Sequence, residues 1–343
     1  MYHHVIGLDI GGANLKAAHT NGVARVQPFA VWKTPQELPK ALQQLLARLP
    51  SEDLLAVTMT AELCDCYATK REGVHAILDA VEALRHQHVL VWQNDGGFAT
   101  LAQARREVYK TAAANWLAVG TFAARFCPAK GPALVVDIGT TTTDIVPIRN
   151  GIPVPQGRTD TERMAAHELL YMGVRRTPLC ALFGLKNEFA WRERRVPPAA
   201  ELFATTQDAY QVLGDLPEDH TNRDTADGRP ATKRHAHARL ARMLCLDTDS
   251  FKWDDALAMS QEVRDCQVAA ILQATRSFQP PRQRKPQTIV VAGAGEFLAR
   301  LAYRSGPHLK ARLVSLAEKI GPRVSQAACA YAVAVLAAER LKS

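Results

Sequence analysis

One short pattern occurs twice in this chain of 343 residues, and it constrains the fold more than any other feature. In each copy an apolar run leads into Asp-Ile-Gly, a small or polar turn, a second run and finally Asn-Gly. The copies are Leu8–Gly11 with Asn21-Gly22, and Val136–Gly139 with Asn150-Gly151. An apolar run that ends in a glycine turn is typical of a strand entering a hairpin, and Asn-Gly favours a second tight turn. The repeat therefore predicts two related domains, at residues 1–126 and 127–343.

The rest of the sequence predicts alternating strands and helices, which indicates an α/β fold with helices packed on mixed sheets. In the first domain we expect further strands at 29–33, 54–59 and 88–92, helices at 35–49 and 74–85, and a long helical stretch at about 98–126. In the second domain we expect a mostly helical insertion at about 160–285, with an irregular polar loop at 216–237. A buried strand at 288–292 and an alanine-rich helix at 327–341 complete the chain.

Each Asp-Ile-Gly turn has the composition of a phosphate-binding site. Because glycine has no Cβ, backbone N–H groups around it can converge on an anion. The candidate phosphate-binding residues are Gly11, Gly12, Asn14 and Lys16 in the first turn, and Gly139, Thr140, Thr141 and Thr142 in the second. We expect the two turns to face each other across a cleft, with Lys16 adding a positive charge. The alternative is that each turn is only a polar hairpin connection.

Two aspartates end the strands that precede these turns. Asp9 and Asp137 are therefore candidate ligands for Mg²⁺, which prefers carboxylate, water and phosphate oxygens. The sequence contains no G-x-x-x-x-G-K-[ST], which excludes a P-loop as the phosphate site.

The formal net charge of +8 suggests an anionic partner, and its distribution narrows the choice. Residues 1–126 carry 12 basic and 11 acidic side chains, so the excess lies in the second domain. Aromatic residues make up 6% of the chain and are not interleaved with the basic ones, which argues against nucleic acid. No apolar run is long enough to span a membrane. We therefore expect the anion to be a small molecule.

The cysteines and the N-terminus favour a cytoplasmic protein. The odd number of seven cysteines does not suit a disulfide framework, and Cys64-x-Cys66 lacks a second pair at zinc-ligand spacing. The N-terminus has neither the basic region nor the cleavage signal of a secretory leader. His235 and His237 lie in a basic stretch that would repel a cation, so we expect solvated histidines there rather than metal ligands.

The sequence contains a third glycine element, Gly293-Ala294-Gly295, in addition to the two turns. With Gly293 and Gly295 included, the chain resembles the superfamily of actin, sugar and acetate kinases, and heat-shock ATPases, whose members carry two phosphate motifs and one adenosine motif. The resemblance implies two ribonuclease H-like domains around a central nucleotide cleft, the actin-like ATPase/sugar kinase fold. Gly293 and Gly295 would then complete the phosphate and adenosine site.

A narrower resemblance runs along nearly the whole chain. It is carried by Thr58–Leu63, Gln93–Gly96, Ala114–Leu117, Asp137–Asp144, Tyr171–Val174, Arg176–Pro178, Glu201–Thr205 and Thr225–Pro230. These motifs resemble the hydantoinase/oxoprolinase-like proteins of tetrahydromethanopterin-linked one-carbon metabolism, a subfamily similar to the methanofuran-biosynthesis synthase. One departure is Ala61, where the family usually has glycine.

The resemblance implies a transferase that joins an aminomethyl-furan-methyl diphosphate to a phenol oxygen and releases diphosphate. The acceptor would be γ-glutamyltyramine or, for methylofuran, a tyrosine-derived phenol. Lys16 would neutralise the leaving group. Asp95 would be the base, because it matches the base position of related sugar kinases, and the alternative for Asn94-Asp95-Gly96 is an Asx turn.

Further residues are candidates for substrate binding. Glu62 would pair with the aminomethyl cation, its alternative being a solvated carboxylate. The acidic tail of the acceptor would use Arg158, Arg175 or Arg176, each of which is otherwise an ordinary surface charge.

Two other functions stay open at this point. One is an ATP-dependent kinase of a small hydroxyl substrate, with Asp95 as base and Gly293 and Gly295 at the adenosine. The other is a nucleotide-binding regulatory module with slow ATPase activity. Mg²⁺ is the expected cofactor, with ATP added in these two cases. The sequence is compatible with a homo-oligomer and leaves the acceptor open.

Overall fold

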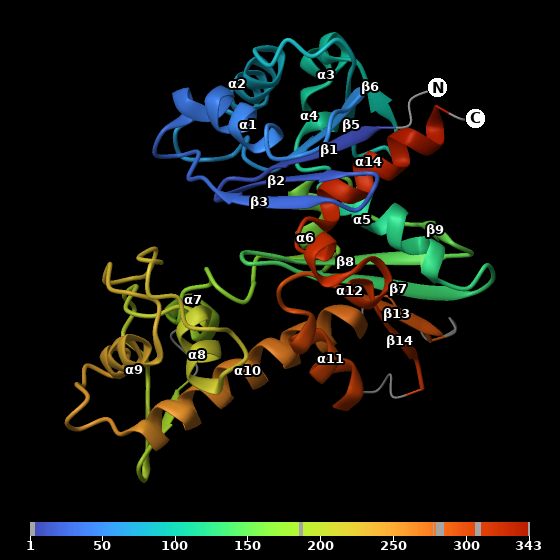
Figure 1. Ribbon diagram of the computed structural model, residues 1–343. Helices are drawn as coiled ribbons and strands as arrows, with labels where there is room; N and C mark the ends of the chain where they lie inside the picture. Colours follow the sequence, from blue (N-terminus) through green and yellow to red (C-terminus); the bar gives the residue numbers. More distant parts are fainter. Residues whose placement is uncertain (1–3, 185–187, 277, 279–284, 306–309, 342–343) are drawn as a thin grey trace.

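The computed structural model describes residues 4–184, 188–276, 278, 285–305 and 310–341, and it contains two large β-sheets (Figure 1). The first sheet has the strand order β3-β2-β1-β4-β5-β6. Its strands are β1 (Val5–Ile10), β2 (Asn14–His19), β3 (Ala24–Pro28), β4 (Leu54–Met59), β5 (Val89–Trp92) and β6 (Phe98–Ala99). β1, β4 and β5 run parallel to one another, whereas β2, β3 and β6 are antiparallel to their neighbours.

Both faces of the first sheet are covered, which explains the continuous apolar runs of its central strands. On one face Leu55 and Val57 share a core with helices α1 and α2, and on the other Leu54 and Ala56 share a core with helix α14. The elements that accompany this sheet are η1 (Pro35–Glu37), α1 (Leu38–Leu46), α2 (Lys70–Glu82), α3 (Leu101–Arg106) and α4 (Val108–Thr111).

The second sheet repeats the central arrangement of the first. Its order is β10-β8-β7-β13-β14, with β9 added beside β8. Its strands are β7 (Pro132–Ile138), β8 (Thr143–Arg149), β9 (Ile152–Pro153), β10 (Leu169–Leu170), β13 (Thr288–Ala292) and β14 (Arg312–Ser315). The β7–β8 hairpin corresponds to β1–β2, and β13 lies parallel to β7 as β4 lies parallel to β1. The predicted relation between the two halves of the chain is thus visible in their sheets.

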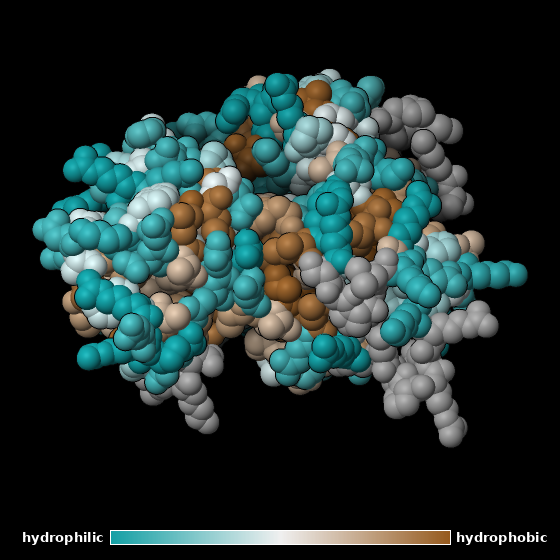
Figure 2. Space-filling view, turned by 90° about the horizontal axis from the view of Figure 1, so that it is seen from below, coloured by the Kyte–Doolittle hydropathy of each residue, from teal (hydrophilic) through white to brown (hydrophobic). Residues whose placement is uncertain are grey.

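The insertion between β10 and β13 forms a lobe with its own core, away from the sheets (Figure 1). Its elements are α7 (Leu179–Phe183), β11 (Phe189–Trp191), β12 (Arg194–Val196), α8 (Thr206–Leu213), α9 (Lys233–Arg242) and α10 (Trp253–Arg276). Helix α6 (Asp160–Ala165) precedes β10 and lies before the insertion. The long α10 leads back to α11 (Glu296–Ser305) beside the second sheet. On the face seen from below, apolar residues gather near the middle and hydrophilic residues cover both sides (Figure 2).

Two helices lie between the sheets (Figure 1). α5 (Asn115–Ala123) contacts the second sheet at β7 and β8, and α14 (Ala328–Arg340) contacts β1, β2 and β4 of the first. They also pack against each other. The last helix therefore belongs in space with the first sheet, although the sequence repeat assigns it to 127–343.

Several predicted elements differ from the structure. The third strand is β3 at Ala24–Pro28 rather than 29–33, because the Asn21-Gly22 turn returns the chain directly against β2. The expected long helix at 98–126 is broken into β6, α3, α4, α5 and η2 (Ala124–Phe126). A capping box at Thr100 begins α3, and a positive φ of 47° at Ala113 separates α4 from α5. Short helices α12 (Leu316–Ile320) and α13 (Pro322–Ser325) precede α14.

Substituting Gly7 tests the contact between β1 and α14. A Cβ at this position would lie 1.8 Å from the carbonyl oxygen of Ala330, and a backbone atom cannot rotate away. We expect Gly7→Ala to lower the free energy of unfolding by about 1–3 kcal/mol or more, the usual cost of overpacking. Urea unfolding measures it, and an unchanged midpoint would contradict this docking of α14.

Within the described ranges, no helix is both long and apolar enough to cross a membrane.

Candidate active site between the two sheets

The first glycine turn connects β1 to β2 and contains backbone N–H groups that donate no hydrogen bond within the described residues. The Gly11 N–H closes the hairpin by donating to the Asn14 carbonyl at 3.1 Å. The carbonyls of Gly12 and Ala13 accept hydrogen bonds from the loop that follows β3. The N–H groups of Gly12 and Ala13 have no partner among the described residues. With its carbonyls occupied and its N–H groups available, the turn suits an anion.

The second turn, between β7 and β8, is built in the same way. The Gly139 N–H donates to the Thr142 carbonyl at 2.8 Å. The carbonyls of Gly139 and Thr140 accept N–H groups from residues 174–176. That approach requires glycine at 173, where a Cβ would lie 2.5 Å from Thr140 backbone. The N–H groups of Thr140 and Thr141 have no partner in the described part of the chain.

The third glycine element packs directly against the end of β7. Gly293 has a φ of 86°, and a Cβ there would lie 2.3 Å from the Asp137 carboxylate. The Gly295 N–H donates to the Ile138 carbonyl at 2.8 Å, so it is already used within the fold. These glycines thus allow close packing beside Asp137, and their contact with a nucleotide stays a prediction.

Asp9 and Lys16 form an ion pair at the edge of the first turn. They are partners in the β1–β2 register, and Lys16 Nζ lies 3.5 Å from Asp9 Oδ2. The other carboxylate oxygen, Asp9 Oδ1, is buried without a hydrogen-bond partner. Burial opposes the charge of Lys16, but Asp9 and, more weakly, Asp137 outweigh it and raise its pKa. One ammonium group therefore interacts with the aspartates of both sheets.

The residues present fit the expected magnesium ion. Burial and the neighbouring Asp144 raise the pKa of Asp137 to about 7, against the opposing effect of Lys16. Negative charge is thus in excess, and a hard divalent cation bound to carboxylate oxygens would relieve it. No cluster of three or more His, Cys, Asp or Glu side chains suited to a metal occurs among the described residues. Substrate oxygens and water would have to supply the remaining ligands.

A buried arginine next to this cluster was not predicted from the sequence. Arg163 is 1% exposed, lies 2.8 Å from Asp144 and stacks on Trp116 with its guanidinium carbon 3.9 Å from the ring centre. Cys329 on α14 is also close enough to the charges of Asp9 and Lys16 for its pKa to respond to them. The feature of the sequence that points to this ion pair is Asp144 itself, which ends the threonine-rich motif Asp137–Asp144.

Asp95 forms the Asx turn that was the alternative to its role as base. Its Oδ1 accepts the Gly97 N–H at 3.0 Å, and its Oδ2 lies 3.4 Å from Lys110 Nζ at an exposed position. The preceding Asn94 exchanges hydrogen bonds with Arg158, whose guanidinium donates to the Asn94 carbonyl at 2.7 Å. Arg158 thus joins the two halves of the molecule.

Glu62 is buried, so the alternative prediction that it is a solvated carboxylate is wrong. It follows β4 and is 1% exposed. Its Oε2 atom has no hydrogen-bond partner. Burial raises the pKa of Glu62 to about 7, against the effect of backbone N–H groups and Lys70. Lys70 pairs with Asp160 at 3.5 Å, an ion pair between the two halves that the sequence did not suggest.

The consecutive residues Arg175 and Arg176 differ in their surroundings. Both backbone N–H groups bind the Thr140 carbonyl, which places the pair beside the second turn. The Arg175 side chain is half-buried and donates to Gln207 at 3.0 Å. The exposed Arg176 stacks on Trp32 of the first half, 4.8 Å from the ring centre, and lies 3.6 Å from an Asp224 oxygen.

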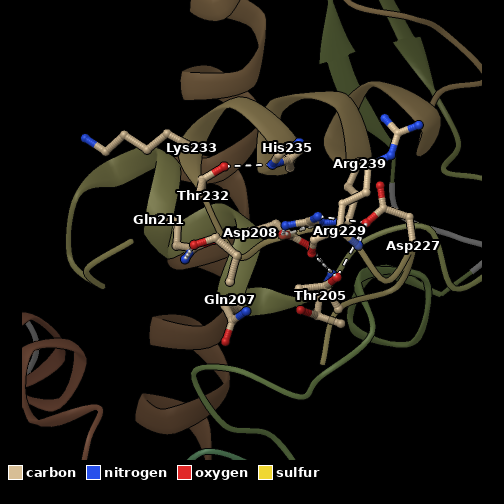
Figure 3. Close-up of polar contacts among 12 residues, drawn as sticks. Thr205, Gln207, Asp208, Gln211, Asp227, Arg229, Thr232, Lys233, His235 and Arg239 are labelled. Carbon is tan, nitrogen blue, oxygen red and sulfur yellow. Dashed lines mark hydrogen bonds and ion pairs between the residues drawn. The ribbon is translucent and has the colours of Figure 1, made fainter. Parts of the chain in front are cut away.

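The loop that carries Asp224 is fixed by a buried network (Figure 3). Arg239 on α9 is fully buried, contacts Asp208 on α8 at 2.7 Å and contacts Asp227 at 2.9 Å. Arg242 also reaches Asp227, at 3.2 Å. The Thr225–Pro230 motif is thereby tied to the lobe. His235 and His237 lie on α9 in hydrogen bonds to Thr232 and to the Phe251 carbonyl, and are half-buried rather than solvated.

Two related sheets with a glycine turn on each and two helices between them define a protein of the actin-like ATPase/sugar kinase fold. A nucleotide-free structure of acetone carboxylase shares this fold with a TM-score of 0.51 at 8% identity, covering 97% of this chain and 70% of the other. The sequence model described as Hydantoinase/oxoprolinase matches residues 53–340. The chain belongs to the hydantoinase/oxoprolinase family.

Two relatives carry the same name. One, from Methanocaldococcus jannaschii, is 31% identical over 341 residues, 98% of each chain, and is the (4-{4-[2-(γ-L-glutamylamino)ethyl]phenoxymethyl}furan-2-yl)methanamine synthase. The other, from Methanococcus vannielii, is 31% identical over 61% of this chain and 92% of its own length. The predicted family is thus confirmed, and the chain is a biosynthetic enzyme of the transferase type with a small-molecule substrate.

Proposed function

We propose that this enzyme joins an aminomethyl-furan-methyl diphosphate to the phenol oxygen of γ-glutamyltyramine, or of a tyrosine-derived acceptor, and releases diphosphate. This is the ether-forming step of methanofuran or methylofuran biosynthesis. The observation that supports it most is the pair of turns, each with two available N–H groups, with Lys16 close to the aspartates of both. Such an arrangement can hold a diphosphate, and the name of the relative supplies the ether product.

The reaction requires charge neutralisation at the leaving group. The bond between the furfuryl carbon and the diphosphate oxygen breaks, its electron pair leaves with diphosphate, and the phenol oxygen bonds to that carbon. Lys16 and the N–H groups of the two turns would stabilise the negative charge that develops on diphosphate. Asp9 and Asp137 would hold Mg²⁺, which when bound adds further neutralisation of the diphosphate. The phenol proton must pass to a base, for which the sequence suggested Asp95.

A direct assay tests the proposal. The protein is incubated with Mg²⁺, the furan diphosphate and γ-glutamyltyramine, tyramine or tyrosine, and an ether product is sought by mass spectrometry together with free diphosphate. Ether formation with stoichiometric diphosphate is expected. ADP formed from ATP only with an acceptor alcohol would replace the proposal by the kinase function, and acceptor-independent ATP hydrolysis would replace it by the regulatory module.

Arg175 is expected to bind the acidic tail of the acceptor. Its half-buried guanidinium has Gln207 as a neutral partner, and burial lowers its pKa, with a weaker opposing effect from Asp219. Arg175→Gln should raise KM for γ-glutamyltyramine about tenfold, the value of one charge-assisted hydrogen bond, and leave KM for tyramine unchanged. Arg176→Gln is the control, since Asp224 already neutralises Arg176. Equal effects of Arg175→Gln on both acceptors would contradict this role.

A further inference from the structure

We propose that Glu62, rather than Asp95, is the catalytic residue that accepts the phenol proton. This inference rests on the proposed function and assigns the base for that same reaction.

The segment after β4 lies against the first phosphate turn. β4 is the parallel neighbour of β1, and the Thr60 N–H donates to the Ile10 carbonyl at 2.9 Å, so both strands end at the same edge. A Cβ on Gly11 would lie 3.6 Å from Thr60 Oγ1, and one on Gly12 would lie 2.9 Å from Cys64 Sγ. Residues 60–64 thus border the turn, and Glu62 is in the middle of the segment.

Glu62 has the properties that a base at this place needs. Its side chain is buried, and its Oε2 atom accepts no hydrogen bond. An oxygen that folding leaves without a donor keeps its capacity to accept a proton. The two carboxylate oxygens of Asp95, in contrast, are both engaged, one in the Asx turn and one with Lys110, and the residue is exposed.

The groups around Glu62 come from several elements. Lys70 on α2 and Asp160 on α6 form their ion pair nearby, Cys64 follows on the same segment, and the Ala113 backbone faces it from the loop before α5. Partial burial and then Asp160, Cys64 and Glu62 raise the pKa of Tyr171, whose phenol is 67% exposed. The phenol ring of Tyr171 therefore lies within electrostatic reach of Glu62.

The proton balance is simple. As the phenol oxygen bonds to the furfuryl carbon, its proton passes to Glu62 Oε2, and the electron pair of the broken carbon–oxygen bond leaves with diphosphate. Glu62 then returns the proton to water before the next turnover. A carboxylate with its pKa raised to about 7 accepts a proton more readily than an unperturbed one.

The test compares Glu62→Gln with Asp95→Asn in the full-length enzyme, assayed by ether formation as a function of pH. Glu62→Gln should lower kcat at least 100-fold with KM for the diphosphate substrate unchanged, and should abolish the fall in kcat below about pH 7. Glu62→Asp should restore part of the rate. Asp95→Asn, at the base that the sequence suggested, should still show the fall in kcat below about pH 7.

A second measurement separates catalysis from folding. Because the folded protein favours the protonated form of Glu62, wild type loses stability as pH rises from about 4.5 to 7. Glu62→Gln should lose less over the same range, and the loss that remains comes from other buried carboxyls with a raised pKa, such as Asp137. Urea unfolding at several pH values checks this. If wild type forms ether and Glu62→Gln is fully active, or Asp95→Asn alone loses the rate, Glu62 is not the base. If wild type forms no ether, the proposed function itself fails and this assignment fails with it.

Discussion

Lys16→Ala is expected to lower kcat/KM for the diphosphate substrate by about 10²–10³-fold, the range seen when one preorganised donor is removed from a developing negative charge. Lys16 is the cation paired with Asp9 and also interacts with Asp137 of the other sheet. Removing it leaves both aspartates without that charge at the place where we expect diphosphate to bind. Steady-state kinetics with the furan diphosphate measures the effect.

Controls separate the charge of Lys16 from its contribution to folding. Lys16→Arg keeps the charge and should retain more activity than Lys16→Ala. Lys40→Ala removes an exposed lysine whose acidic partner among the described residues is Glu37, at 3.9 Å, and should change nothing. Wild-type kinetics for Lys16→Ala would remove Lys16 from the mechanism, whereas loss of folded protein, seen by urea unfolding, would assign it a structural role.

Asp208→Ala is expected to cause the largest loss of stability in the lobe. Asp208 and Arg239 form a contact of 2.7 Å at 2% and 0% side-chain exposure. Removing Asp208 leaves the buried Arg239 with Asp227 as its remaining acidic partner, and breaking a buried ion pair costs about 3–5 kcal/mol. Asp208 also accepts the N–H of Thr205, the N-cap residue of α8, so the helix loses one half of its capping box at the same time.

The measurement is urea unfolding, with Asp265→Ala as the matched control. Asp265 pairs with Arg264 at 3.3 Å but is 70% exposed, and exposed pairs contribute less than about 1 kcal/mol. Replacing Asp208 and Arg239 together by apolar residues should recover part of the loss, because neither charge of this pair is then left buried and Asp227 keeps Arg242 as a partner. Equal stabilities for Asp208→Ala and Asp265→Ala would contradict the structural role of this network.

The central strands and turns could be predicted from the sequence because local signals define them. The strands at 54–59 and 288–292 are found as predicted, since a continuous apolar run bounded by polar residues and glycine is unambiguous when both faces are buried. The two Asp-Ile-Gly turns were recognisable because each repeats the other.

What the sequence did not indicate depends on contacts between distant residues. The Lys70–Asp160 pair arises only when the two halves meet, and the burial of Glu62 depends on Gly73 of α2 packing against its backbone. The strand expected at 29–33 is a loop because its N–H groups are used to cover the carbonyls of the first turn. No local pattern distinguishes an N–H group needed for a turn from one needed for a sheet.

Each sheet is covered by a helix from the other half of the chain, since α5 of the first half contacts the second sheet and α14 of the second half contacts the first. If a duplicated ancestral unit gave rise to the two sheets, neither copy is now autonomous. The Leu54 and Ala56 face of the first sheet is completed by α14, which is synthesised more than 200 residues later. A nascent chain thus exposes this apolar surface until α14 has been synthesised, and we expect the two halves to fold together rather than one after the other.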